Sequence, residues 1–176
     1  MKQAQRAHRR YSSGFTLLEI LVVVLIIGIL IALVVPNTGR ILAAAQQAVC
    51  ASHMRSIRVA LDSYLQDHEQ VWPQGPPPQE DGWADFWLST LQPYEIRPDT
   101  WKCPVIRSWA RGADDPNLAL HYVPTMFDAT PNIAHRWSTQ PWLIEIADAH
   151  GKGPLIAFPD GSVKPYSKVL AEQGVP

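Results

Sequence analysis

The sequence is poor in cysteine, with only Cys50 and Cys103 in 176 residues. Two cysteines exclude a dense disulfide scaffold. They do not form a C-x-x-C pair, so they give no sign of a zinc ribbon or of a thioredoxin-like redox site. One intrachain bridge is the most that this sequence can form.

An excess of one charge sign is also missing, since 15 Lys and Arg oppose 16 Asp and Glu for a formal net charge of −1. With 47% hydrophobic and 18% charged residues, the chain is neither a disordered acidic tail nor a basic nucleic-acid-binding domain. No nucleic acid is therefore predicted as a partner. The balance hides an asymmetry, because residues 1–14 hold four basic side chains and no acidic one. The remainder has 11 basic and 16 acidic side chains, a net charge of −5.

Residues 20–35 contain no charge at all, and with Phe15–Leu18 in front they form an apolar stretch of 21 residues interrupted only by Glu19. As a helix rising about 1.5 Å per residue, this stretch covers about 31 Å, the thickness of a bilayer's hydrocarbon core. The sequence after Val35 does not match the small-residue cleavage site of a secretory signal peptide. The basic residues in front predict a cytoplasmic N-terminus and an extracytoplasmic remainder.

Glu19 is the exceptional residue of this stretch. A carboxylate within a membrane-spanning helix costs about 2.5–3.5 kcal/mol on insertion scales. The side chain could reach the membrane interface, or it could pair with a cation. A chain cut just before Phe15 would supply such a cation as a free α-amine.

The segment Gly14–Glu19, followed by the uncharged run and Pro36, closely resembles the processing signature of type IV pilins and of type II secretion pseudopilins. The resemblance implies that a prepilin peptidase cleaves between Gly14 and Phe15 and that Phe15 is then N-methylated. The resemblance also implies that Glu19 and Pro36 are the fifth and twenty-second residues of the mature chain, where the family has them. It further implies that Glu19 pairs with the terminal amine of a neighbouring subunit during assembly. Other pilin subunits, an inner-membrane assembly platform and membrane lipid are the implied partners.

Residues 37–70 have apolar and small side chains at helical spacing, which predicts an amphipathic stalk helix to about Glu69. Pro36 and Gly39 predict a break near residues 36–39. We expect the alanine-rich first half to pack against other subunits. The second half is expected to be covered by the chain's own outer domain.

Fifteen of the 16 prolines and all seven tryptophans follow residue 70. We predict that the proline-rich stretch 71–78 ends the stalk helix and that residues 71–176 form an extracytoplasmic domain of short strands and ordered loops around an aromatic core. A short helix is expected at 84–91, and a hairpin turn at Pro159–Gly161. Strands are expected at 118–123, 142–147 and 155–158. The predicted fold class is α+β, with a long N-terminal helix on a small antiparallel sheet.

His150, nine further residues and then Asp160-Gly161 resemble the H-x9-DG tail of a group of pilin-like proteins with the same cleavage signature. Other positions also look recurrent in that group: Cys50, Cys103-Pro104, and Tyr64 with Asp67. The resemblance suggests the group without indicating which assembly the protein joins.

Several side chains are candidates for chemistry. Asp148 and His150 could form an acid–base pair, with His121 and His135 nearby. No Ser or Cys nucleophile motif accompanies them, so we predict no catalytic residues and no enzymatic activity. We also predict no cofactor or bound metal. The alternative is a Ca²⁺ site at Asp148 and Asp160, although Asp-Gly occurs in hairpin turns for geometric reasons alone.

The two cysteines would lie in an oxidising compartment outside the cytoplasm. A Cys50–Cys103 disulfide would contribute about 4 kcal/mol in the chain-entropy model. Two buried free thiols are an equally good interpretation, because sequence carries no geometry.

The sequence thus predicts a prepilin-like structural subunit of a type IV pilus or a type II secretion pseudopilus. It would consist of a basic leader (1–14), a membrane and assembly helix (15–36), a stalk helix (37–70) and an outer domain (71–176). Its predicted location is the bacterial inner membrane, with a single pass, and then the pilus. Two alternatives stay open: a minor tip pilin that initiates assembly, and an uncleaved, membrane-anchored periplasmic binding domain.

Overall fold

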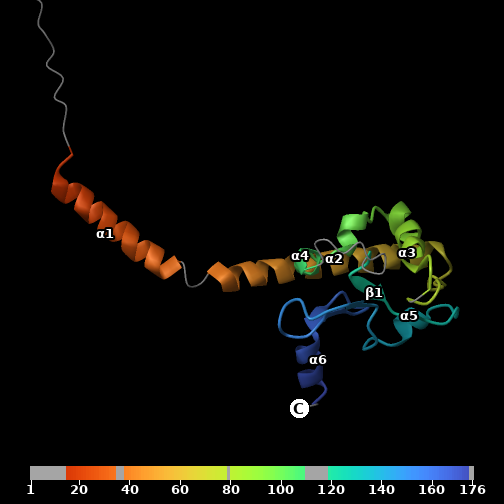
Figure 1. Cartoon of the computed structure of the whole chain (residues 1–176). Helices are drawn as coiled ribbons and strands as arrows, with labels where there is room; N and C mark the ends of the chain where they lie inside the picture. Colours follow the sequence, from red (N-terminus) through yellow and green to blue (C-terminus); the bar gives the residue numbers. More distant parts are fainter. Residues whose placement is uncertain (1–14, 35–37, 79, 110–118, 175–176) are drawn as a thin grey trace, which may run out of the picture. The chain divides into compact units, whose positions relative to one another are not determined.

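The computed structural model describes residues 15–34, 38–78, 80–109 and 119–174. It divides into two compact units, Met1–Ile41 and Leu42–Pro176. Helix α1 (Leu17–Val34) lies in the first unit, and most of α2 (Thr38–Asp67) lies in the second (Figure 1). Gly14 and Pro36, both predicted to be functional, fall outside the described residues.

Helix α1 begins with a capping interaction that the sequence encodes locally. The Glu19 backbone N–H donates to Thr16 Oγ1 at 3.2 Å. This is one half of a capping box, in which a threonine precedes a glutamate by three residues and satisfies a free N–H of the first turn. In the described residues no single helix is long and apolar enough to cross a bilayer, whereas α1 and α2, separated by a short break, meet that criterion together by length and composition.

Helix α2 changes character along its length. Up to Val49 its side chains are exposed or half-buried, and from Cys50 onward one face is buried. The buried side chains follow helical spacing: Cys50, Ala51, Met54, Ile57, Ala60, Leu61 and Leu65. The prediction that the outer domain covers only the second half of the stalk helix is therefore confirmed.

The end of α2 differs from the prediction. The helix stops at Asp67, before the prolines, where Glu69 and Gln70 both adopt left-handed backbone conformations with φ of 54° and 62°. The Gln70 N–H turns back to donate to the Leu65 carbonyl at 2.7 Å. A left-handed residue satisfies carbonyls of the last turn and reverses the chain, so local capping and not proline ends this helix.

The outer domain contains a four-stranded antiparallel sheet in the order β1-β2-β3-β4. Its strands are β1 (Tyr122–Pro124), β2 (Leu143–Glu145), β3 (Leu155–Ala157) and β4 (Val163–Pro165). Together with α2 they confirm the predicted α+β class. The strands are shorter than expected, because pairing is confined to three residues in each.

The predicted hairpin joins β3 to β4. The Gly161 N–H donates to the Phe158 carbonyl at 3.0 Å, and Gly161 has a φ of 81°, which favours glycine. Asp160 Oδ1 accepts the Ser162 N–H at 2.8 Å. The Pro-Asp-Gly sequence therefore works as a turn, as the prediction states.

The outer domain is richer in short helices than predicted. Only α3 (Trp83–Leu91) was expected. The structure adds η2 (Gln92–Tyr94), η3 (Pro98–Trp101), α4 (Pro104–Trp109), α5 (Ile133–Arg136) and α6 (Tyr166–Glu172). The reading of the prolines as marks of loops and strands was wrong here, because η3 and α4 each begin at a proline. Proline fits the first helical position, where its missing N–H would have no partner.

The core is aromatic, as predicted. Four tryptophan side chains are fully buried: Trp72, Trp87, Trp101 and Trp142. The Trp72 ring lies 5.2 Å from Trp142 and 4.8 Å from Phe127 between centroids, in edge-to-face arrangements. The Trp142 indole N–H donates to the Ala134 carbonyl at 2.9 Å, which ties α5 to the sheet.

Candidate functional site

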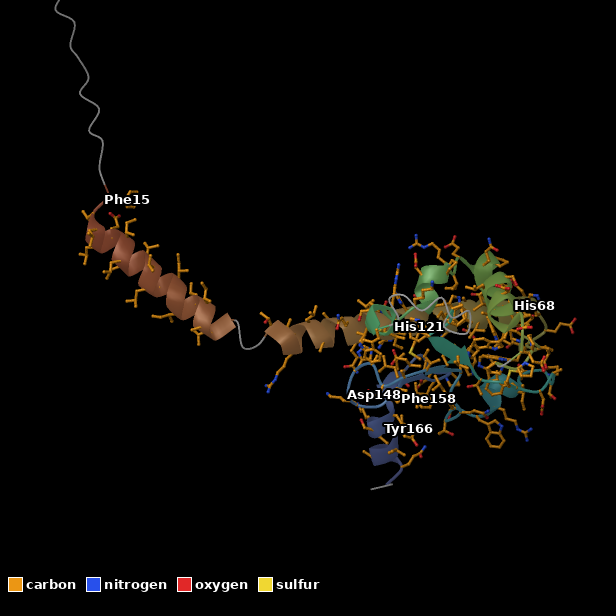
Figure 2. All side chains as sticks on the ribbon, in the orientation of Figure 1. Phe15, His68, His121, Asp148, Phe158 and Tyr166 are labelled. Carbon is orange, nitrogen blue, oxygen red and sulfur yellow. The ribbon has the colours of Figure 1, made fainter. Side chains whose placement is uncertain are left out.

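The surface of α1 is the first candidate site. Its large apolar side chains, like that of Phe15 just before it, are between 43% and 83% exposed, and they project from all around the helix (Figure 2). A helix that is apolar on every side is stable only when lipid or protein covers it. The described part of this unit supplies no such cover.

Glu19 is the only charged residue in the described residues 15–34. The capping bond to Thr16 uses its backbone N–H, and no ion pair involves its carboxylate among the residues described. The position in the first turn suits a negative charge because the helix dipole is positive there. Its carboxylate remains available for a partner outside the described chain.

A buried cluster in the outer domain is the second candidate site. It consists of Cys50, Cys103, Glu145 and His150, whose sulfur, oxygen and nitrogen atoms all lie within 4.8 Å of one another. The cysteines come from α2 and from the residue before α4, whereas Glu145 ends β2 and His150 follows in the next loop. Four chain segments therefore meet at one point.

The two cysteines are free thiols, with Sγ atoms 2.7 Å apart. This short contact shifts the pKa values of the two thiols in opposite directions. Hydrogen bonding with Cys50 raises the pKa of Cys103, and burial adds to the rise. The same contact lowers the pKa of Cys50 despite its burial, with the nearby Tyr122 hydroxyl contributing. The intact mass of the purified protein distinguishes these free thiols from a Cys50–Cys103 disulfide.

The acid and the imidazole of this cluster are almost inaccessible to solvent. The Glu145 and His150 side chains are 0% and 2% exposed, and Glu145 Oε1 lies 3.6 Å from His150 Nε2. Glu145 Oε2 accepts the Leu155 N–H at 3.1 Å, whereas Oε1 has no hydrogen-bond partner. Burial raises the pKa of Glu145 to about 7.

Of the other predicted chemical residues, His121 borders this cluster, whereas His135 and Asp148 have partners elsewhere. His121 Nδ1 accepts the Cys103 N–H at 2.9 Å and so positions the chain at that cysteine. His135 lies 3.6 Å from Asp62 of α2. Asp148 Oδ1 accepts the Lys152 N–H at 3.1 Å in its own loop. The hydrogen bond of Asp148 and the ion pair of His135 are therefore with Lys152 and Asp62 and not with His150.

The two predicted calcium ligands also act within separate turns, Asp148 beside Lys152 and Asp160 beside Ser162. Hydrogen bonds from Ser162 lower the pKa of Asp160. Calcium binding at these residues stays a prediction.

Glu145 is the residue that sequence reasoning missed. It lies within the strand predicted at 142–147, and no role was predicted for it. In β2 the side chains alternate, so that Leu143 and Glu145 face the core and Ile144 faces outward. The available signal was this alternation, which places an acid on the buried face of a strand.

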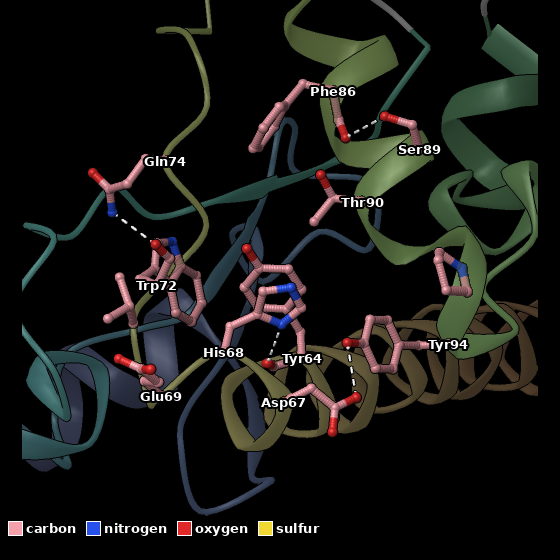
Figure 3. Close-up of a pocket in the computed structure, with 12 residues that line it drawn as sticks. Tyr64, Asp67, His68, Glu69, Trp72, Gln74, Phe86, Ser89, Thr90 and Tyr94 are labelled. Carbon is pink, nitrogen blue, oxygen red and sulfur yellow. Dashed lines mark hydrogen bonds between the residues drawn. The ribbon is translucent and has the colours of Figure 1, made fainter.

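A groove runs beside the end of α2 (Figure 3). Tyr94 donates its hydroxyl hydrogen to Asp67 Oδ2 at 3.0 Å, and the Tyr64 and His68 rings stack with centroids 3.8 Å apart. Gln74 donates to the Trp72 carbonyl at 2.7 Å. Tyr64 and Asp67 therefore hold the helix end against η2 and the following connector.

Comparison with known protein families gives a match over the segment that contains α1. Residues 9–35 match the motif described as "Prokaryotic N-terminal methylation motif". The chain carries this motif. It is 48% identical over 60 residues to the type II secretion system core protein G of Pseudomonas aeruginosa, which is 34% of this chain and 42% of that protein. It is 44% identical over 62 residues to the core protein G of Aeromonas hydrophila, which is 35% of this chain and 43% of that protein.

The chain thus spans less than half the length of the curated relatives it matches. No solved structure matches it. The predicted resemblance to pseudopilins is confirmed by the motif and by these relatives. The roles of Gly14, Phe15, Glu19 and Pro36 stay predictions.

Proposed function

We propose that the protein is a pilin-like, non-enzymatic structural subunit that is cut between Gly14 and Phe15, methylated at the new Phe15 amine and assembled into a pilus or pseudopilus. The observation that carries the proposal is the exposed apolar surface of α1, which directly follows the predicted cut. The methylation motif at residues 9–35 supports it.

Assembly would cover α1 in two steps. Lipid covers the helix first, in a single pass through the bacterial inner membrane with the N-terminus in the cytoplasm and the outer domain outside. In the fibre, α1 helices of other subunits replace the lipid. A prepilin peptidase and an inner-membrane assembly platform are the partners that these steps require.

Glu19 would set the register between subunits. Its carboxylate and the Phe15 amine each cost free energy in an apolar fibre core when they are unpaired. Pairing across two subunits offsets both costs, and it does so only at one axial offset. The Thr16 cap does not compete, because it uses the Glu19 N–H and leaves the carboxylate free.

Mass spectrometry of the chain extracted from membranes tests the cleavage. We expect the mature protein to begin at N-methylphenylalanine 15. The Gly14→Ser variant should keep Met1, because a side chain blocks close approach of the peptidase to the scissile backbone. Gly39→Ser is the matched control, since a Cβ at Gly39 meets nothing within 4 Å, and it should be processed as wild type. A wild-type chain that retains its leader would contradict the proposal and favour an uncleaved membrane anchor.

A further inference from the structure

The buried cluster of Cys50, Cys103, Glu145 and His150 has the composition of a metal site. We propose that these four side chains bind one Zn²⁺ through two thiolates, one carboxylate and one imidazole. The site is independent of pilin assembly, because all four residues belong to the unit Leu42–Pro176.

The spacing of the ligand atoms fits a tetrahedral ion. Zn–ligand bonds of about 2.0–2.3 Å place neighbouring ligand atoms about 3.3–3.8 Å apart. Cys103 Sγ lies 3.8 Å from His150 Nε2, and that nitrogen lies 3.6 Å from Glu145 Oε1. The sulfur pair, at 2.7 Å, has to open by about 1 Å, and all four ligand atoms already lie within 4.8 Å of one another. A small rotation of two side chains achieves this.

Glu145 provides a second, independent observation. Its side chain is fully buried, its Oε2 is bound by the Leu155 N–H, and its Oε1 is aimed at the cluster without a hydrogen bond. A buried carboxylate oxygen without a hydrogen bond is costly, and the nearest nitrogen, His150 Nε2, lies 3.6 Å away. A Cys50–Cys103 disulfide would leave this oxygen as it is, because a disulfide carries neither charge nor a hydrogen to donate. A cation bound between the four side chains gives the oxygen a ligand bond.

The donor set selects the type of ion. Thiolate, imidazole and carboxylate are all zinc ligands, and a four-coordinate, buried arrangement suits a structural zinc ion, whereas Ca²⁺ and Mg²⁺ require oxygen ligands. On binding, the two thiols lose their protons to solvent, and no electron is transferred. The ion carries +2 against two thiolates and one carboxylate, so the site holds one net negative charge.

Neighbouring groups would orient the ligands. The Leu155 N–H fixes the Glu145 carboxylate, and His121 Nδ1 holds the Cys103 backbone N–H. The buried hydroxyl of Tyr122 lies close to Cys50. Outer groups of this kind orient metal ligands in proteins. The zinc ion would then link α2, the start of α4 and β2, at the two cysteines for which the sequence left a disulfide and two free thiols as alternatives.

The test uses the full chain, purified in detergent without chelator or reductant. We expect about one zinc per chain by elemental analysis, and an intact mass that shows two reduced cysteines. After removal of zinc, added Co²⁺ should produce the charge-transfer absorption of cobalt–thiolate bonds. Zinc should protect both cysteines of the wild-type chain from alkylation and raise its thermal unfolding temperature.

Variants separate the zinc site from a structural role of the same residues. Glu145→Gln and His150→Gln should each weaken zinc binding by about tenfold or more, as loss of a ligand does. Glu80→Gln, on the exposed surface, is the control and should bind as wild type. Cobalt absorption and alkylation on the wild-type chain do not depend on the variants' ability to fold.

The proposal is overturned if the purified chain carries a Cys50–Cys103 disulfide and binds zinc only after reduction. It is also overturned if Co²⁺ gives no thiolate absorption, or if both ligand variants bind zinc as tightly as the wild type. None of these outcomes affects the cleavage test at Gly14, so the two proposals fail separately.

Discussion

Helix α1 and the outer domain differ in whether the chain itself covers their apolar side chains. In α1 the large apolar side chains are exposed, whereas Trp72, Trp87, Trp101 and Trp142 in the outer domain are covered by the same chain. The outer domain thus buries its large hydrophobic side chains within its own core. The α1 segment can do so only with lipid or other subunits, and for this reason its sequence indicates the partner class more clearly than any other part of the chain.

The largest effect is expected from a substitution in the core of the outer domain. Trp72→Ala removes the ring that contacts Phe127 and Trp142, and we expect the free energy of unfolding of the outer domain to fall by about 3–5 kcal/mol. Trp137→Ala is the matched control, because Trp137 is 52% exposed, and it should change stability by less than about 0.5 kcal/mol. Denaturant unfolding followed by near-UV circular dichroism measures both. Equal losses in the two variants would contradict the assignment of Trp72 to the core.

The next largest effect is expected from a substitution in α1, the helix that depends on lipid or other subunits for cover. Glu19→Gln keeps the backbone N–H that Thr16 Oγ1 caps but removes the charge, so the proposed pair with the Phe15 amine of a neighbouring subunit would be lost. At about 2.5–3.5 kcal/mol for a stranded charge, we expect incorporation into fibres to fall by roughly a hundredfold, with membrane insertion unchanged. Sedimentation of sheared fibres measures the incorporation.

Glu80→Gln is the control for this experiment and should assemble normally. Normal fibre yield from Glu19→Gln would contradict the proposed charge pair between Glu19 and the Phe15 amine. A minor tip pilin would give the same result, because it does not require the charge pair at every subunit interface.

Sequence patterns predicted those parts of the fold that local chemistry determines. The helical spacing from Cys50 to Leu65, the helix near residues 84–91 and the Pro-Asp-Gly hairpin all follow from periodicity or turn residues within a few positions. The end of α2 was misassigned because left-handed residues such as Glu69 and Gln70 leave no strong compositional signal. The short helices η3 and α4 were missed because proline, which ends helices, also occurs at their first position.

The buried cluster could be predicted only in part. Cys50 and Cys103 were paired as candidates, and His150 was noted through the H-x9-DG resemblance, but no sequence rule joined them. Their proximity depends on how α2, the loop before α4 and β2 pack, which is set by contacts distant in sequence. The structure also explains the spacing of nine residues, because strand β3 must fit between His150 at the cluster and the turn at Asp160.

The smallest expected effect refines the comparison within the outer domain, at the β3–β4 turn. Asp160 accepts a hydrogen bond from Ser162, which holds its pKa below the ordinary value of 3.8. A depressed carboxyl pKa contributes stability above the ordinary value, and this contribution is lost as the pH falls through the folded-state value. Asp160→Ala should therefore destabilise the domain at pH 7 by less than about 1 kcal/mol, and the difference from wild type should shrink toward about pH 3.

Asp160→Asn is the matched control for the turn, because its amide oxygen can accept the same Ser162 N–H without a charge. We expect it to retain most of the stability at pH 7 and to show less dependence on pH than the wild type. Urea midpoints measured at several pH values compare the three chains. A pH-independent difference between Asp160→Ala and wild type would mean that the turn depends on the shape of the aspartate and not on its charge, and the exposed hairpin would then resemble the core in being held by geometry alone.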